Sequence, residues 1–126
     1  MTSRTTSLAL LALTGIAALA AVPAQAGTSA QRKPQKKTVT VNDNYYGPTK
    51  LTVNNGSTIS WDWTDTTADI HDVKLVSAPK GVKQFQSGEG SAGYLYKKKL
   101  TKPGVYKFIC TFHESDGMKM TITVRK

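Results

Sequence analysis

Cysteine and histidine are scarce in this chain of 126 residues, which contains one cysteine and two histidines. A lone cysteine excludes an internal disulfide framework and leaves three roles for its thiol: an intermolecular bridge, a reactive group or a metal ligand. Two histidines are also too few to serve several metal centres. The chemistry of this protein must therefore depend on a handful of side chains.

Long hydrophobic runs are also lacking. The one apolar stretch runs from Leu8 to Val22, about 15 residues, whereas a membrane-spanning helix needs about 20. Arg4 precedes this stretch, and Ala24-Gln25-Ala26 follows it with the small-x-small form of a cleavage site. Residues 1–26 are therefore predicted to be a signal peptide. After its cleavage near Ala26 the protein is expected to be exported, periplasmic or extracellular, with no membrane span.

Acidic residues are few, 8 against 17 Lys and Arg, which gives a net charge of +9. Loss of Arg4 with the signal peptide leaves 16 basic residues and a net charge of +8. Residues 27–37 are basic and have no large apolar side chain, so they are predicted to be a flexible leader. Residues 38–126 are predicted to form one domain. Nucleic acid is excluded as a partner because no recognition motif is present.

No helical period of useful length occurs in this predicted domain, and apolar residues instead alternate with the period of two that half-buried strands show. Turn sequences such as Asn54-Asn55-Gly56 and Lys102-Pro103-Gly104 separate the alternating runs. Several short strands at this spacing predict an all-β, antiparallel β-sandwich. The alternating residues are Val39 and Val41; Leu51 and Val53; Ile59, Trp61 and Trp63; Val73 and Leu75; Tyr106, Phe108 and Cys110; Met120, Ile122 and Val124.

The single cysteine begins a run that places three kinds of metal ligand within nine residues, from Cys110 through His113 to Met118. A thiolate, two imidazoles and a long, weak thioether bond are the ligand set of a blue-copper site. The other histidine of the chain is His71. The composition therefore predicts one type 1 copper ion, with His71, Cys110 and His113 as strong ligands and Met118 as the weak axial ligand.

Met120 competes with Met118 for the axial position. It lies two residues further on and shares the face of Ile122 and Val124, which predicts a place in the core. The spacing from His113 favours Met118. Gly117 just before Met118 allows the tight turn that would return the thioether to the metal.

These residues resemble those of the cupredoxins, in particular of the plastocyanin and pseudoazurin type, whose ligand loop reads Cys-x2-His-x4-Met. Further similar sequence segments extend the resemblance over roughly residues 38–126. They are Gly56–Trp61, His71–Val73, Phe85–Gly88 and Gly104–Cys110. The resemblance implies an antiparallel Greek-key β-sandwich and a monomer that shuttles single electrons between redox partner proteins. It also implies that the ring edge of His113 reaches the surface as the electron port.

One departure from the family concerns Asp72. The residue after the first histidine is commonly Asn in cupredoxins, where its side chain helps to fix the ligand loop. The substitution is compatible with copper binding, but it puts in doubt the hydrogen bonds that orient the loop.

Other functions fit the sequence less well. An enzyme with a Cys–His nucleophilic pair would lack a third orienting group and, in so small a domain, a substrate cleft. A zinc site would use methionine, which is a poor zinc ligand. The alternative that the sequence separates least from electron transfer is a copper carrier or storage protein, because it would use the same ligands.

The net positive charge favours redox partners with acidic surfaces, since opposite charges accelerate association. This expectation depends on Lys97, Lys98, Lys99 and the basic leader. Glu114 and Asp116 lie close to the predicted port, so the surface there could also select partners by charge.

Overall fold

The computed structural model describes residues 30–126, and the predicted signal peptide and residues 27–29 lie outside them. The described chain is all-β, with eight strands and no helix. It accordingly contains no helix that could cross a membrane. The strands are β1 (Lys36–Asn42), β2 (Tyr45–Gly47), β3 (Lys50–Asn54), β4 (Ser57–Trp63), β5 (Lys74–Ser77), β6 (Leu95–Leu100), β7 (Gly104–Ile109) and β8 (Lys119–Arg125).

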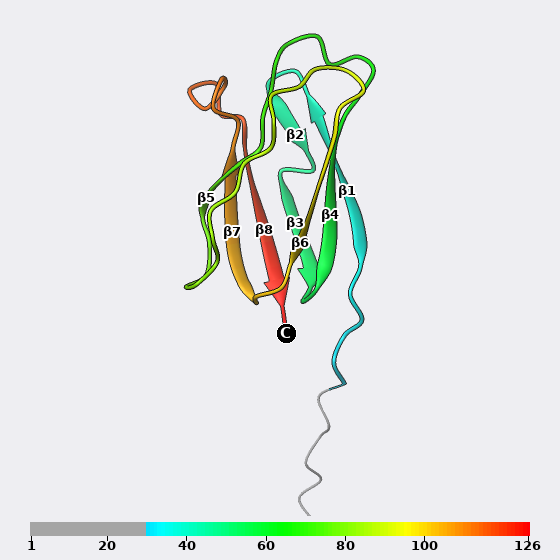
Figure 1. Cartoon of the computed structure of the whole chain (residues 1–126), viewed down its shortest axis with the longest axis vertical. Helices are drawn as coiled ribbons and strands as arrows, with labels where there is room; N and C mark the ends of the chain where they lie inside the picture. The colour runs from blue at the N-terminus through cyan, green and yellow to red at the C-terminus, as the bar shows by residue number, and fades with distance from the viewer. Residues whose placement is uncertain (1–29) are drawn as a thin grey trace, which may run out of the picture.

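The strands form two four-stranded sheets that face each other, which confirms the predicted sandwich (Figure 1). The strand order is β2-β1-β4-β6 in one sheet and β3-β8-β7-β5 in the other. Most neighbours are antiparallel, but β1 pairs with β4 and β3 pairs with β8 in parallel. These parallel pairs arise because the chain leaves β2 and enters β3 in the opposite sheet instead of turning back in a hairpin, so the two sheets are mixed.

The alternating residues predicted from the sequence line the space between the sheets. They are buried, except for Leu51, which is partly buried against the core. Trp61 of β4 is at the centre, with its ring centroid 5.2 Å from that of Phe108 on β7. Its indole Nε1 donates a hydrogen bond to Sδ of Met120 at 3.3 Å. The side chain of Trp61 thus links its own sheet to the opposite sheet.

Strand β1 begins at Lys36, two residues before the expected start of the domain. Lys36 and Lys37 pair with Thr58 and Ile59 of β4, and the backbone amide of Gln35 donates to Oγ of Ser57 at 2.8 Å. Backbone pairing requires no apolar side chain, so composition alone gives no sign that Lys36 and Lys37 belong to a strand.

Met120→Leu tests the contact between Met120 and Trp61. Exchange of Leu and Met in a core usually costs less than about 1.5 kcal/mol. Here it also leaves the buried Trp61 Nε1 without its acceptor, which costs about 1–3 kcal/mol. We expect the free energy of unfolding, measured in denaturant, to fall by about 2 kcal/mol.

Trp61→Phe/Met120→Leu is the matched double variant for this test. It removes donor and acceptor together, so its loss should be smaller than the sum of the two single losses. Strict additivity would show that the hydrogen bond contributes nothing to stability.

Candidate metal centre

The three strongest candidate ligands lie at one end of the sandwich, which we call the copper end. It consists of the turn between β1 and β2, the segment that joins β4 to β5, the part of the β5–β6 segment around Gly90, and the loop between β7 and β8 (Figure 1). His71 lies in the β4–β5 segment. Its backbone exchanges two hydrogen bonds with Gly90, of 2.9 and 3.0 Å, and its side chain is fully buried. This first ligand is therefore fixed by the neighbouring segment.

The loop from Cys110 to Met118 follows β7 and leads into β8, and its own backbone closes it. The amide of Cys110 donates to the carbonyl of Met118 at 3.0 Å, and the amide of Met118 donates to the carbonyl of His113 at 3.1 Å. Gly117 has a φ of 85°, a conformation that L side chains rarely adopt. The loop thus holds Cys110, His113 and Met118 in a closed turn between two paired strands.

The ligand atoms of His71, Cys110 and His113 lie within 4.8 Å of one another. Sγ of Cys110 is 3.7 Å from Nδ1 of each histidine. Nitrogen and sulfur bonds to a divalent metal are about 2.0 and 2.3 Å long. Two such donors 120° apart around one ion are separated by about 3.7 Å, by the geometry of those bond lengths. The three residues therefore fit a trigonal N₂S site, and this donor set selects copper.

Asp43, in the turn between β1 and β2, orients the ring of His71. Its Oδ1 lies 3.2 Å from Nε2 of His71. A carboxylate can only accept a hydrogen bond here, so Nε2 carries the proton and Nδ1 presents its lone pair to the metal position. The carboxylate also accepts from the backbone amides of Ala68 and Asp69. Hydrogen bonds from Asp69 and His71 lower the pKa of Asp43.

Asp43 is the functional residue that sequence reasoning missed. It precedes His71 by 28 positions in a polar turn, Asn42-Asp43-Asn44, that reads as ordinary turn chemistry. No signal in the sequence connects the two, because only the parallel pairing of β1 with β4 brings this turn beside the β4–β5 segment.

Asp72 performs the anchoring that its departure from the family pattern put in doubt. Its Oδ1 accepts from the backbone amide of Thr111 at 2.7 Å, and its Oδ2 accepts from Oγ1 of Thr111 at 2.6 Å. Gln86 Nε2 donates to the same carboxylate at 2.7 Å. The hydroxyl of Tyr46 donates to the backbone carbonyl of Asp72 at 2.5 Å. The buried carboxylate thus ties the ligand loop to the β4–β5 segment that carries His71.

Burial raises the pKa of the Cys110 thiol. A metal binds the thiolate, so binding must displace the thiol proton. The side chain is fully buried, which shields the sulfur from oxidants in solution. This environment suits an occupied ligand better than a reactive surface thiol.

Exposure differs among the four predicted ligands. His71, Cys110 and Met118 are fully buried, whereas His113 is partly exposed. Two neighbours of the ligands are large exposed hydrophobic residues: Phe112 is 46% exposed and Ile70 is 52% exposed. Of the four, His113 therefore gives the shortest route from the site to the surface.

Comparison with known proteins agrees with this geometry. The family model described as copper binding proteins of the plastocyanin/azurin family matches residues 34–125. A halocyanin of Natronomonas pharaonis is 29% identical over 80 residues, which are 63% of this chain and 47% of the halocyanin. The matched region thus spans about half the length of that relative.

Two solved structures show the same fold. A Sinorhizobium pseudoazurin is 22% identical, with a TM-score of 0.63, and the match covers 73% of this chain and 75% of that protein. A copper-containing nitrite reductase from Thermus scotoductus is 27% identical, with a TM-score of 0.60, over 75% of this chain but 23% of the reductase. The family match spans most of the chain and the ligand cluster fits one type 1 copper ion. This protein therefore belongs to the plastocyanin/azurin family of copper binding proteins and is a cupredoxin.

Proposed function

We propose that this protein is an exported electron carrier that cycles one type 1 copper ion between Cu(I) and Cu(II). In this proposal His71, Cys110 and His113 bind the ion equatorially and Met118 is the axial ligand. The observation that carries the proposal is the 3.7 Å spacing of both Nδ1 atoms from Sγ of Cys110 in a buried cluster.

The chain holds the ligands still, which lowers the cost of changing the oxidation state of the ion. Copper, when bound, supplies the reversible one-electron change. The Asp43 carboxylate fixes the ring of His71, and the Asp72 carboxylate fixes the start of the ligand loop at Thr111. Both anchors connect segments far apart in the sequence, so the geometry of the ligands depends on the folded sandwich. A site held in this way needs little reorganisation during electron transfer.

Electron exchange is proposed to occur through His113. Its ring is partly exposed and its neighbour Phe112 extends into solvent. An apolar contact there would exclude water and bring a partner's redox group close to the copper ligand.

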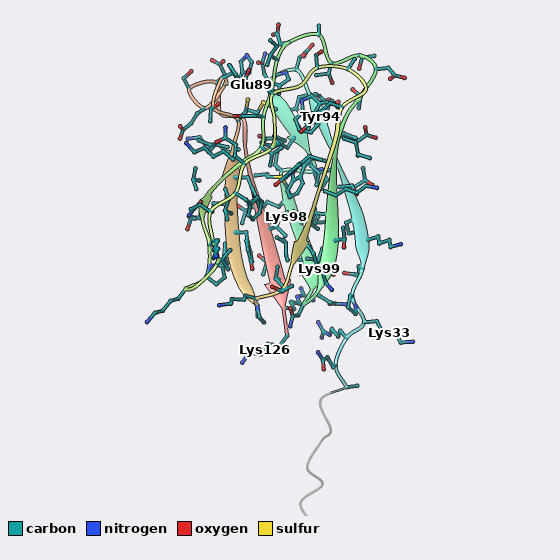
Figure 2. All side chains as sticks on the ribbon, in the orientation of Figure 1. Lys33, Glu89, Tyr94, Lys98, Lys99 and Lys126 are labelled. Atoms are coloured by element: carbon teal, nitrogen blue, oxygen red, sulfur yellow. The ribbon has the colours of Figure 1, made fainter. Side chains whose placement is uncertain are left out.

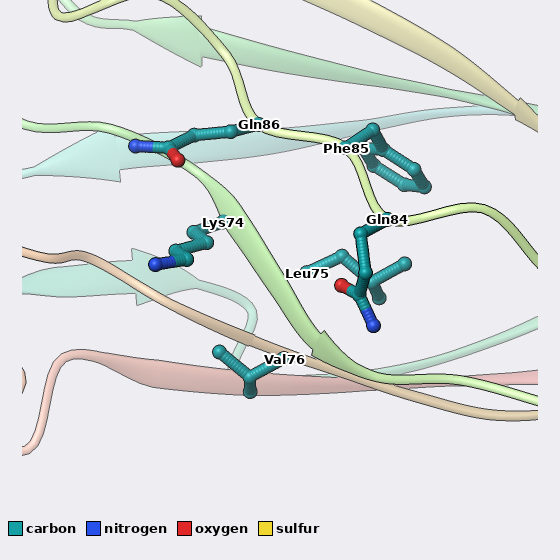
Figure 3. A pocket seen from close by; sticks show the side chains of 6 residues that line it. All are labelled: Lys74, Leu75, Val76, Gln84, Phe85 and Gln86. Atoms are coloured by element: carbon teal, nitrogen blue, oxygen red, sulfur yellow. The ribbon is translucent and has the colours of Figure 1, made fainter.

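A groove of 510 Å³ lies along β5, and its lining lacks both histidines and the cysteine. It is lined by Lys74, Leu75, Val76, Gln84, Phe85 and Gln86 (Figure 3). Its one ionisable side chain is Lys74, and both histidines and the cysteine belong to the metal cluster. We therefore propose a carrier with no catalytic activity of its own.

Copper delivery or storage is the alternative with the same ligands. Transfer of a metal to another protein requires that the acceptor reach the ligands, but His71 and Cys110 have no exposed surface. The burial that would slow such a transfer favours retention of the ion and exchange of electrons only.

Cys110→Ser should remove the colour of the oxidised protein, because an intense blue band requires a Cu(II)–thiolate bond. The measurement is the visible spectrum and the copper stoichiometry of the protein lacking residues 1–26. Ser115→Ala, at an exposed position of the same loop, is the control and should stay blue. A blue Cys110→Ser variant, or a wild type that takes up zinc alone, would refute the assignment.

Met118→Leu should retain copper and colour but raise the reduction potential by tens of millivolts. Loss of a weak axial donor destabilises Cu(II) more than Cu(I), and the axial ligand is known to tune this site. Voltammetry measures the shift. Met120→Leu is the control and should leave the potential unchanged; the opposite pattern would assign the axial role to Met120.

Asp72→Asn should preserve the site, because the amide oxygen can accept from the Thr111 backbone and its NH₂ can donate to the hydroxyl of Thr111. The amide of Gln86, which donates to Oδ2 of Asp72, can turn over so that its own oxygen accepts from that NH₂. Asp72→Leu should lower the free energy of unfolding of the metal-free protein by about 1–3 kcal/mol, since it leaves polar partners unpaired. It should also accelerate copper release to a chelator. Equal stability and release in both variants would mean that Asp72 does not anchor the loop.

A further inference from the structure

The charges of this protein are divided between the two ends of the sandwich. All eight acidic residues of the chain lie in or next to the segments that form the copper end. Figure 2 shows one of them, Glu89, at this end. The eight are Asp43, Asp62, Asp65, Asp69, Asp72, Glu89, Glu114 and Asp116.

The opposite end, which we call the basic end, carries most of the positive charge. Lys33, Lys99 and Lys126 lie there in Figure 2, together with the two chain ends of the domain. Lys97 and Lys98 lie further along the edge strand β6, paired with Ser60 and Ile59 of β4. The remaining basic-end residues are Arg32, Lys36, Lys37, Lys80, Lys83, Lys102 and Arg125.

Four lysines are exceptions. Lys74 and Lys119 begin β5 and β8 at the copper end. Lys50 of β3 and Lys107 of β7 both pair with Thr121, two residues further along β8 than Lys119. Nζ of Lys119 lies 3.6 Å from Oε1 of Glu114 and offsets part of its charge. The other exposed carboxylates of the copper end, among them Asp65, Asp69, Glu89 and Asp116, have no lysine or arginine partner among the ion pairs of the described residues.

Distance separates the electrical effects of the two ends. A strand rises about 3.3 Å per residue, so the seven residues of β4 separate the ends by about 20 Å. The Debye length at physiological ionic strength is about 8 Å. A partner at His113 therefore experiences the nearby carboxylates, and the lysines of the basic end are screened from it.

The copper end also offers a contact surface. Ile70 and Phe112 are exposed beside His71 and His113. Asp69 and Glu114 are next to them in the chain, Asp116 follows His113 by three residues, and all three acids are exposed. An exposed apolar patch with a charged rim is typical of a protein docking site. Complementarity of charge then specifies the sign of the surface that fits it.

We propose that the redox partner of this protein presents a cationic surface around its own electron-exchange site and docks that surface on the copper end. The net charge alone predicts a partner with an acidic surface. The cationic partner replaces that prediction, because the lysines on which it depends lie away from His113. The proposal presupposes the electron-carrier function and adds the chemistry of the partner to it.

The test uses two small one-electron oxidants of opposite charge with the reduced protein: tris(phenanthroline)cobalt(III), with charge 3+, and hexacyanoferrate(III), with charge 3−. Cu(I) becomes Cu(II) while Co(III) becomes Co(II), or Fe(III) becomes Fe(II), and no atom is transferred. Stopped-flow rates are measured from 0.1 to 1 M salt, over which the Debye length falls from about 10 Å to about 3 Å, so the basic end, about 20 Å away, stays screened throughout.

The carboxylates near His113 attract a cation and repel an anion, and salt weakens both effects. We therefore expect the rate with the cobalt complex to fall at least about threefold across this salt series and the rate with hexacyanoferrate to rise. Glu114→Gln/Asp116→Asn should flatten both slopes without changing the visible spectrum. The control Lys97→Gln/Lys99→Gln, which alters exposed residues of β6, should leave both slopes as in the wild type.

A second measurement does not depend on copper. Hexaamminecobalt(III), also 3+, is titrated into the metal-free protein and amide chemical shifts are followed by NMR. Shifts should concentrate at Asp69, Glu114 and Asp116, and Glu114→Gln/Asp116→Asn should weaken them.

Reversed salt slopes in a blue protein, or NMR shifts spread evenly over the surface, would overturn the cationic partner while leaving the electron-carrier function intact. A protein that shows no blue colour and no reversible oxidation would instead overturn the proposed function itself.

Discussion

The carboxylate of Asp72 connects the two parts of the metal centre, and the ligand geometry depends on that connection. His71 and Cys110 are 39 residues apart and belong to segments that no local interaction could bring together. Asp72 follows His71 directly and accepts two hydrogen bonds from Thr111, which follows Cys110 directly. Each of these two ligands is thus positioned by its own neighbour. The carboxylate of Asp72 therefore helps to fix the distance from Sγ of Cys110 to Nδ1 of His71.

A buried carboxylate is costly unless its partners compensate for lost hydration. Asp72 has three donors to its side chain, from Thr111 and Gln86. Asp43 makes a comparable contribution from the other side, where it accepts from His71 and from the loop that precedes it. The two acids surround the ligand cluster with acceptors that select one tautomer and one loop conformation. The rigidity that suits electron transfer is therefore built from hydrogen bonds around the ligands as well as from the ligands themselves.

Segregation of charge gives the molecule two different ends. The core strands need apolar residues on their inner faces only, so the outer faces and the connecting segments are free to carry any charge. In this chain the segments around the ligands carry the acids, while the far turns, the edge strand β6, the start of β1 and the segment before it carry most of the lysines (Figure 2). Lysines on an edge strand also oppose pairing with the edges of other sheets. The net charge of +9 for the whole sequence therefore does not give the sign of the charge on the surface that a redox partner would contact.

The sequence by itself determined the fold class and the identity of the ligand types. Alternation of apolar residues specifies which faces of the strands are buried, and the run from Cys110 to Met118 is local, so its spacing survives folding. The parallel pairs β1/β4 and β3/β8, the strand position of Lys36 and Lys37, and the roles of Asp43 and Asp72 were decided by tertiary structure. Each depends on contacts between residues distant in the chain: Asp43 meets His71 across 28 positions and Asp72 meets Thr111 across 39. A sequence pattern shows which residues are neighbours along the chain. The sheets decide which distant segments meet at one end of the sandwich. That meeting sets the partners of a buried carboxylate and the sign of the charge at a binding surface.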